Sequence, residues 1–395
     1  MKLFPNLVRA VTEATDEIFN HQRYADKVIE KVLKSNPKWG ARDRGFIAET
    51  VYDMVRWRRL IEYLSPSNDL YHLFGTYWVM NNRTLPDWRE FKGISTGYIA
   101  SRYQKLDNRA ILQSIPDWLD EMGSAQLGEL WEKEIDTLNQ QAEVVIRVNT
   151  LKTSRDDLRH RLEEDGIETY LPKGYKDALV LSKRQNIFKH PAFKEGMFEL
   201  QDASSQKVAM ALEVAPGMRV IDACAGAGGK SLHLATLMEN KGTIISLDVE
   251  EWKLQQAKLR ARRNGISIME PRPIEGTKTI KRLKESADRL LLDVPCSGLG
   301  VLKRNPDTKW KLSPESIEKV QAMQQEILQQ YPSMLKRGGL LVYATCSILP
   351  SENQDQIEKF LASPIGQDFE LLEDEKVLAQ ESGFDGFYIA RLRRK

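Results

Sequence analysis

The sequence places two cysteines where a reaction site is expected. Cys296 follows the apolar run LLLDVP, and Cys346 follows GGLLVYAT. In an open parallel sheet, ligands and reacting groups collect in the crevice outside the carboxyl ends of the strands. If both runs are strands of one sheet, the two thiols face the same crevice. This arrangement favours a mechanism that uses both thiols.

A glycine-rich turn earlier in the chain indicates a cofactor site. The segment MRVIDACAGAGGK predicts a short buried strand over Val220 to Asp222, then a turn from Ala223 to Gly229 that opens a helix at Lys230. In such a turn, backbone N–H groups can approach a cofactor closely because few side chains stand in the way. A turn of this kind is a weak signal by itself, so the residues after it must identify the ligand.

The next predicted strand, GTIISLDVE over residues 242–250, ends in Asp248. An acidic residue roughly twenty positions past the last loop glycine accepts hydrogen bonds from ribose hydroxyls, so the predicted ligand carries a ribose. NAD, FAD and S-adenosylmethionine all do. The loop has the pattern G-x-G-G and not G-x-G-x-x-G, which gives little support for a pyrophosphate grip. The pattern therefore favours S-adenosylmethionine and argues against a dehydrogenase.

The elements that must position these residues predict an α/β fold. Strands and helices alternate from Gln201 onward, and DFELL with FYIARLRRK predicts an antiparallel pair at the sheet edge. Upstream, a strand over Val144 to Lys152 and a helix with a capping box at Ser154 and Asp157 predict a small α+β module. Apolar residues at three-to-four spacing predict helices before it. The predicted domains are 1–115, all-helical; 116–200, the α+β module; and 201–395, a Rossmann-like catalytic domain.

Composition limits the class of protein. The 395 residues are 41% hydrophobic and 29% charged, with a formal net charge of +2, so any nucleic-acid partner must meet a local basic surface. Three cysteines and no secretory signal argue against a disulfide framework. Charges recur through the first twenty residues, and the five histidines are scattered. We expect a monomeric cytoplasmic protein with no membrane segment and no metal.

Two segments are candidate basic surfaces for RNA. The predicted helix ARDRGFIAETVYDMVRWRRL is rich in arginine, and a solvated helix face explains it as well as an RNA-phosphate contact does. The segment after Cys296 carries basic residues around Trp310, which favours backbone contact and base stacking. Its basic residues are Lys303, Arg304, Lys309 and Lys311.

Several motifs together resemble one enzyme family. DACAGAGGKSLHLA, SLDVEEWKL, LLLDVPCSGLGVLKRNPDTKW, GGLLVYATCSILPSENQ and GFYIARLRRK are similar to successive motifs of the RsmB/Sun family of RNA cytosine-5 methyltransferases. The likeness runs from about Pro116 to the end, and the helical start resembles a NusB-like RNA-binding region. Ala227 departs from the proline that is common in the family's cofactor loop.

The resemblance implies roles for particular residues. Cys346 would be the nucleophile, Asp293 would hold or protonate the cytosine ring at nitrogen 3, and Cys296 would assist release. Glu275, at a predicted strand end, could reach the adenine amino group, although a surface-loop glutamate fits equally well. The candidate cofactor-binding residues are Cys224, Ala225, Gly226, Ala227, Gly228, Gly229, Lys230, Asp248, Lys253, Glu275 and Asp293.

The chemistry of cytosine explains these roles independently. Carbon 5 is a poor nucleophile, so a thiolate must first add at carbon 6 to raise the electron density on carbon 5. A free cysteine titrates near pH ~8.5, so the thiolate needs a nearby positive charge, such as Lys230 or the cofactor's sulfonium. Cys224 fits a small packing residue. The target base must also leave its stack.

The resemblance implies ribosomal RNA as the substrate, and three alternatives remain open. Transfer RNA is the nearest. A catalytically silent RNA-binding ribosome-assembly factor is a second, although the presence of both thiols and Asp293 argues against it. A DNA cytosine methyltransferase is a third, but it would leave the Thr-Cys motif unexplained.

Overall fold

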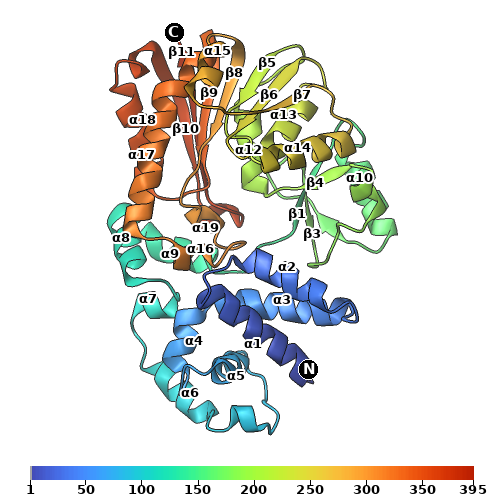
Figure 1. The fold of residues 1–395 in the computed structure, drawn as a ribbon, viewed down its shortest axis with the longest axis vertical. Coiled ribbons are helices and arrows are strands. Elements are labelled where there is room, and N and C mark those ends of the chain that lie inside the picture. The colour runs from blue at the N-terminus through green and yellow to red at the C-terminus, as the bar shows by residue number, and fades with distance from the viewer. Residues whose placement is uncertain (1) are drawn as a thin grey trace. The chain divides into compact units, whose positions relative to one another are not determined.

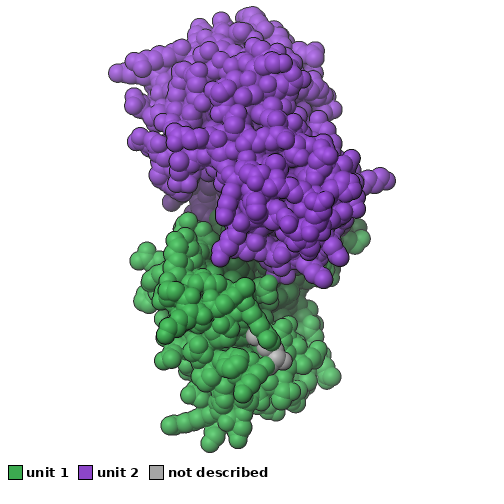
Figure 2. Space-filling view, turned by 90° about the vertical axis from the view of Figure 1, so that its right-hand side faces the viewer, with its two compact units in different colours: residues 1–140, 302–313 green, residues 141–301, 314–395 purple. Residues whose placement is uncertain are grey.

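The computed structural model describes residues 2–395, and the chain forms two compact units (Figure 2). The first contains the chain up to Gln140 together with Leu302–Ser313, and the second contains Gln141–Val301 and Pro314–Lys395. The chain therefore leaves the second unit after Val301, joins the helical unit for one short segment, and returns. No helix within the described residues is long and apolar enough to cross a bilayer.

The first unit is helical, as the three-to-four spacing of its apolar residues predicts. Its core is built by buried residues of α1, α2, α3 and α5, among them Val11, Val51 and Trp78. Phe74 stacks on Trp78 with ring centroids 5.7 Å apart. Its helices are α1 (Pro5–Phe19), α2 (Ala25–Ser35), α3 (Ala41–Arg56), α4 (Arg58–Leu64), α5 (Leu70–Met80), η1 (Arg89–Phe91), α6 (Thr96–Gln104), α7 (Arg109–Leu112), α8 (Asp117–Leu127), α9 (Leu130–Leu138) and α16 (Thr308–Lys311).

The segment after Cys296 is held inside this helical unit. The guanidinium of Arg56 donates to the carbonyls of Leu302 and Lys303 at 3.4 and 3.0 Å. The indole N–H of Trp310 donates to the Val55 carbonyl at 2.8 Å. The ammonium of Lys309 is fully buried. The expected contact of Lys309 with RNA phosphates is therefore corrected, because this side chain is buried within the unit. Trp310 is half-buried, and stacking of RNA bases on it stays a prediction.

The arginines of the α3–α4 region are also mostly engaged within the helical unit. Arg44 donates to the carbonyls of Trp39 and Leu33, both at 2.9 Å. Arg58 pairs with Glu62, and Arg59 binds Asp117 at 2.7 Å. Arg42 is exposed. The sequence left two interpretations of this helix open, a solvated face and an RNA-phosphate surface. An RNA-phosphate surface would have to consist of the exposed side chains.

The second unit begins with a four-stranded antiparallel sheet of order β2-β3-β1-β4. Ser154 caps the helix as predicted, since its Oγ accepts the Asp157 N–H at 3.1 Å. Gly166, just past the end of that helix, has a φ of +74°, a conformation that favours glycine. The elements are β1 (Val145–Val148), α10 (Arg155–Glu164), β2 (Thr169–Tyr170), β3 (Ala178–Leu181), α11 (Pro191–Lys194) and β4 (Phe198–Leu200).

A seven-stranded sheet forms the rest of this unit, in the order β10-β11-β9-β8-β5-β6-β7. Strands β9, β8, β5, β6 and β7 are parallel, and β11 runs antiparallel to both β9 and β10. The strands are β5 (Arg219–Asp222), β6 (Thr243–Asp248), β7 (Met269–Pro273), β8 (Ala287–Asp293), β9 (Leu335–Thr345), β10 (Phe369–Val377) and β11 (Phe387–Arg394). The predicted α/β fold with an antiparallel edge is confirmed.

Helices cover both faces of the large sheet (Figure 1). Along β5, Val220 packs with α12, α13 and α14, while the next residue, Ile221, packs with α15, α17 and α18 on the opposite face. Burial on both faces explains why the parallel strands have continuous apolar runs. The helices are α12 (Ala203–Ala211), α13 (Gly229–Leu237), α14 (Glu251–Asn264), α15 (Thr277–Arg282), α17 (Pro314–Gln330), α18 (Gln354–Leu361) and α19 (Ala379–Ser382), with 3-10 turns η2 (Leu299–Val301), η3 (Tyr331–Met334), η4 (Pro350–Glu352) and η5 (Gly366–Asp368).

The strand order reverses at β5, which has β6 on one side and β8 on the other. Ligands bind at such a switch point, outside the carboxyl ends of the strands. The residues just beyond β5, β6, β8 and β9 are those that the sequence marks as candidates for chemistry.

Candidate active site

The structure brings the two cysteines together. Cys296 lies in the loop after β8, and Cys346 directly follows β9. Their sulfur atoms are 3.3 Å apart, within hydrogen-bond distance, and both are free thiols. Both side chains are partly exposed. The two parallel neighbouring strands therefore deliver their thiols to one place.

The surroundings of Cys296 oppose its ionisation. The hydrogen bond with Cys346 raises the pKa of Cys296 well above its usual range, and burial and the negative charge of Glu352 raise it further. Cys296 is thus held as a thiol whose S–H can donate to the sulfur of Cys346.

A buried carboxylate joins the two cysteine loops. Glu352 is fully buried, and its oxygens accept the Ser297 N–H at 2.7 Å, the Ser297 hydroxyl at 2.5 Å and the Ser347 hydroxyl at 2.5 Å. Gln324 donates to the same carboxylate at 3.2 Å. Because Ser297 and Ser347 each directly follow a cysteine, Glu352 fixes the two loops relative to each other. Glu352 was not predicted from the sequence as a site residue.

A lysine and an aspartate form a close pair beside the thiols. Lys230 Nζ lies 2.5 Å from Asp293 Oδ2, and it lies 5.4 Å from the centre of the Phe387 ring. Burial would lower the pKa of Lys230, but the carboxylate of Asp293 outweighs it and the net shift is upward, with the charged form of Cys346 contributing as well. Lys230 is therefore a fixed cation in this part of the site.

The glycine-rich turn is tied to the end of β6. The Gly226 N–H donates to Asp248 Oδ2 at 2.8 Å, and the Glu250 N–H donates to Asp248 Oδ1 at 2.9 Å. Gly228 has a φ of +80°, and a Cβ there would lie 2.9 Å from the Cβ of Ala257, so the position requires glycine. Helix α13 begins at Gly229, and the N–H groups of a first helical turn have no carbonyl partner within the helix. These groups suit a polar cofactor.

The other predicted cofactor residues lie in different surroundings. Cys224 and Ala225 are in the turn itself, and burial raises the pKa of Cys224 well above its usual range, which fits a packing role. Lys253 Nζ lies 5.8 Å from the centre of the Trp252 ring. Glu275 is exposed, and its N–H donates to Thr279 Oγ1 at 3.1 Å. Lys253 and Glu275 thus have local contacts, and no hydrogen bond among the described residues links them to the turn.

Sequence reasoning missed a buried acid beneath the turn. Asp222 accepts the Ser231 hydroxyl at 2.6 Å, and burial raises the pKa of Asp222 to about 7. It also missed two arginines that bind the turn from outside: Arg147 donates to the Gly229 carbonyl and Arg260 to the Ala227 carbonyl, both at 2.8 Å. The periodicity of a strand or helix gives no sign of partners so far away in the chain.

The fold and the site define a class of enzyme. A doubly wound sheet with a glycine-rich turn after one strand and an acidic residue ending the next is typical of enzymes that bind a ribose-containing cofactor. The two neighbouring thiols after β8 and β9 are residues of a type that can form covalent intermediates.

Comparison with known proteins identifies the family. The sequence model described as "16S rRNA methyltransferase RsmB/F" matches residues 209–393, and the model of an RsmF/B-like ferredoxin-like domain matches residues 115–188. The chain is 33% identical to a probable ribosomal RNA small subunit methyltransferase B of Synechocystis, with 96% of this chain and 97% of that protein covered. The chain belongs to the RsmB/F family of methyltransferases, so the resemblance seen in the motifs is confirmed.

Solved structures agree with this assignment. The structure of the protein PH0851 matches with a TM-score of 0.84 and 25% identity, covering 100% of both chains. A methyltransferase homologue from Pyrococcus horikoshii matches with a TM-score of 0.64 and 28% identity, covering 73% of this chain and 98% of that one. The protein is an S-adenosylmethionine-dependent RNA cytosine-5 methyltransferase.

Proposed function

We propose that this enzyme forms 5-methylcytosine in ribosomal RNA through a covalent bond between Cys346 and the target base. The observation that carries the proposal is the 3.3 Å contact between the sulfurs of Cys296 and Cys346, beside the pair of Lys230 and Asp293. When bound, S-adenosylmethionine supplies an electrophilic methyl group on its sulfonium. The protein must make carbon 5 of cytosine nucleophilic enough to accept it.

Cys346 performs the first covalent step. Its sulfur bonds to carbon 6, and the electron pair of the carbon 5–carbon 6 double bond moves toward carbon 5. The S–H of Cys296 and the ammonium of Lys230 both stabilise negative charge on Cys346. Addition at carbon 6 makes nitrogen 3 more basic, so it takes up a proton, and the resulting N–H donates to the Asp293 carboxylate, which Lys230 holds by a 2.5 Å contact.

The same groups support release. After carbon 5 has gained the methyl group, a water molecule takes its proton, and the electron pair left on carbon 5 restores the double bond as the sulfur–carbon 6 bond breaks. Cys346 departs as a thiolate, for which a nearby thiol donor is an advantage. Cys296 thus assists the departure, and the enzyme returns to its starting state.

We also propose a division of work along the chain. Residues 1–115 and the α+β module at 116–200 contribute RNA binding, and residues 201–395 carry out catalysis. The ferredoxin-like domain matched at residues 115–188 supports the first of these boundaries. By compactness, however, residues 116–140 belong to the helical unit and the module begins at Gln141. Both thiols and the cofactor turn come from one unit of one chain, which supports a monomer. Free thiols at the site suit a reducing compartment such as the cytoplasm.

Bisulfite mapping of ribosomal and transfer RNA tests the substrate. RNA from cells without the gene should lose one or more 5-methylcytosines in ribosomal RNA, and a plasmid copy should restore them. A Cys346→Ala copy, expressed at the same level, should not. Loss of methylation confined to transfer RNA would replace the proposed substrate, and unchanged methylation in both RNAs would reject the activity.

A further inference from the structure

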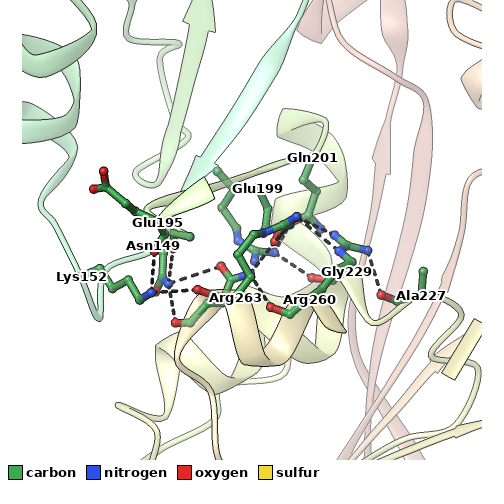
Figure 3. Close-up of polar contacts among 12 residues, drawn as sticks. Asn149, Lys152, Glu195, Glu199, Gln201, Ala227, Gly229, Arg260 and Arg263 are labelled. Carbon is green, nitrogen blue, oxygen red and sulfur yellow. Dashed lines mark hydrogen bonds and ion pairs between the residues drawn. The ribbon is translucent and has the colours of Figure 1, made fainter. Parts of the chain in front are cut away.

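A buried polar network binds the cofactor turn to the α+β module, and both belong to the second compact unit (Figure 3). Arg147 of β1 and Glu199 of β4 are 1% and 3% exposed. Arg260 and Arg263 of α14 both pair with the Glu199 carboxylate, Arg260 at 3.0 Å. Asn264 donates to the same carboxylate at 2.5 Å. The network is closed to solvent at its centre, so it is not itself a surface for RNA.

Two of these arginines also reach the cofactor turn. Arg147 Nη1 donates to the Gly229 carbonyl and to Gln201. Arg260 Nη1 donates to the Ala227 carbonyl (Figure 3). The two bonded carbonyls lie on either side of Gly228. A peptide unit is planar, so fixing its carbonyl also fixes the direction of the N–H that follows. The two arginines therefore set how the backbone enters helix α13.

The turn needs such an external restraint. Gly226, Gly228 and Gly229 lack a Cβ, and Ala227 has no ring that fixes φ. Asp248 holds one side of the turn through the Gly226 N–H at 2.8 Å. Arg147 and Arg260 hold the opposite end. The turn is thus bound at both ends while its N–H groups at the start of α13 remain directed away from the arginines.

The network remains charged at neutral pH. Burial would raise the pKa of Glu199, but the guanidinium of Arg260 and the donors around it lower it, so the group is a carboxylate. Burial lowers the pKa of Arg147 to about 9, which still leaves it protonated at neutral pH. Buried ion pairs are weak contributors to stability compared with apolar packing. Attachment of the module alone does not require buried charges. A role in shaping the turn explains why the free-energy cost of burying these charges is tolerated.

We propose that Arg147 and Arg260 are positioning residues for S-adenosylmethionine, and that the α+β module takes part in cofactor binding through them. The module would then be more than an RNA platform or a spacer. This inference rests on the cofactor of the family and not on which RNA is methylated.

Titration calorimetry of the full-length protein with S-adenosylmethionine alone provides the test. Arg260→Met is the main variant, because its side chain is 23% exposed and its removal is less disruptive than that of Arg147. Arg263→Met is the matched control: it lies on the same helix and loses the same Glu199 partner, but it makes no hydrogen bond to the turn among the described contacts. Loss of one charge-assisted hydrogen bond predicts about tenfold weaker binding for Arg260→Met. The control should stay within about twofold of the parent protein by the same reasoning.

Steady-state kinetics give a second readout that a purely structural role would not produce. Arg260→Met should raise the KM for S-adenosylmethionine while the KM for RNA and the kcat at saturating cofactor stay close to the parent values. Equal cofactor affinities in Arg260→Met and Arg263→Met, with both melting temperatures lowered, would reject the proposal. A change in the KM for RNA alone would also reject it. Because the titration contains no RNA, a wrong RNA assignment would leave its result unaffected.

Discussion

Cys296 Sγ lies 3.3 Å from Cys346 Sγ, although the two residues are 50 positions apart in the chain. Adjacent parallel strands β8 and β9 bring them together, and the pKa of Cys296 is raised chiefly by its hydrogen bond with Cys346. Under the proposed mechanism the two sulfurs have unequal roles, with Cys296 as the S–H donor and Cys346 as the sulfur that carries negative charge.

This inequality predicts opposite effects of removing each thiol. Cys346→Ala should abolish methylation and form no RNA adduct, because carbon 5 is never activated. Cys296→Ala should still attack and methylate but release slowly, so that protein remains bound to RNA through Cys346. A denaturing gel after incubation with unmodified RNA and cofactor, with peptide mapping of any shifted band, measures both. An adduct in Cys346→Ala that maps to Cys296 would reverse the two roles.

Replacing Glu352 should lower the rate of methylation, although the proposed mechanism gives this residue no contact with the substrate. In Glu352→Gln, one acceptor oxygen becomes an amide, so at least one buried donor of Ser297 or Ser347 loses its partner, at a cost of about 1–3 kcal/mol. The two loops then move apart, and the single-turnover rate should fall at least tenfold. Ser347→Ala is the matched control: it removes one donor to the carboxylate and takes the hydroxyl acceptor from the Leu349 N–H alone, so it should have a smaller effect. A wild-type single-turnover rate in Glu352→Gln would contradict this role.

The fold and the main site could be predicted from the sequence because their signals are local. The apolar run before Cys346 reads as a buried strand, and the glycines from Gly226 mark a turn, whatever the rest of the chain does. The position of Asp248 was predicted from its separation from that turn along the chain alone. In each case, a few neighbouring residues determine the structure that positions the side chain.

The parts that could not be predicted depend on partners distant in the chain. Lys309 looks like a basic residue of an exposed loop, but it is buried because Arg56 and Asn139, contributed by helices far upstream, enclose the segment. Glu352 stands in the polar stretch PSENQ and is buried only because two cysteine loops meet around it. Arg147 lies in a strand whose alternation does not indicate that both faces are covered.

Replacing Asp248 should specifically weaken cofactor binding. Asp248→Ala removes the proposed acceptor for ribose hydroxyls and also the observed acceptors for the N–H groups of Gly226 and Glu250. Loss of charge-assisted hydrogen bonds should reduce the binding free energy of S-adenosylmethionine by roughly 1.5–3 kcal/mol. Asp248→Asn keeps one acceptor oxygen and should lose less. Calorimetric titration that gives the parent affinity for Asp248→Ala would remove this residue from the cofactor site.

His233 predicts how stability depends on pH. Burial, aided by the charge of Arg147 and opposed by Asp177, lowers the pKa of His233 to about 4, whereas an unfolded histidine titrates near ~6.5. Between these two pKa values His233 binds a proton in the unfolded chain but not in the folded chain. The free energy of unfolding is therefore fully retained above the unfolded pKa and falls as the pH is lowered toward the folded pKa. The loss amounts to at most about 3 kcal/mol.

Urea unfolding at pH 7.5, 6 and 4.5 measures this effect. His233→Gln keeps an N–H donor for Asp177, which His233 Nε2 approaches at 3.1 Å, but has no proton to gain. The parent protein should therefore lose more unfolding free energy than His233→Gln as the pH is lowered. Parallel losses in the two proteins would mean that other groups account for the acid sensitivity.

Lys309 predicts that removing a buried charge can stabilise the helical unit. Burial and the charge of Arg56 lower the pKa of Lys309 well below its usual range, although its Nζ donates to Asn139 Oδ1 at 2.9 Å. Below the unfolded pKa near ~10.4, Lys309 is protonated in the unfolded chain, whereas burial disfavours its protonated form in the folded chain. This difference lowers the free energy of unfolding as the pH falls. Lys309→Met removes this cost, so its advantage in stability should be larger at pH 7.5 than at pH 10.

Differential scanning calorimetry at these two pH values provides the measurement. The expected gain at pH 7.5 is on the order of 1 kcal/mol, since the apolar replacement forfeits the hydrogen bond to Asn139. Lys311→Met is the matched control: it lies on the same short helix, pairs with Asp307 and is partly exposed, so it should give no gain at either pH. A Lys309→Met protein that is less stable than its parent by the same amount at both pH values would show that the hydrogen bond outweighs the cost of the buried ammonium.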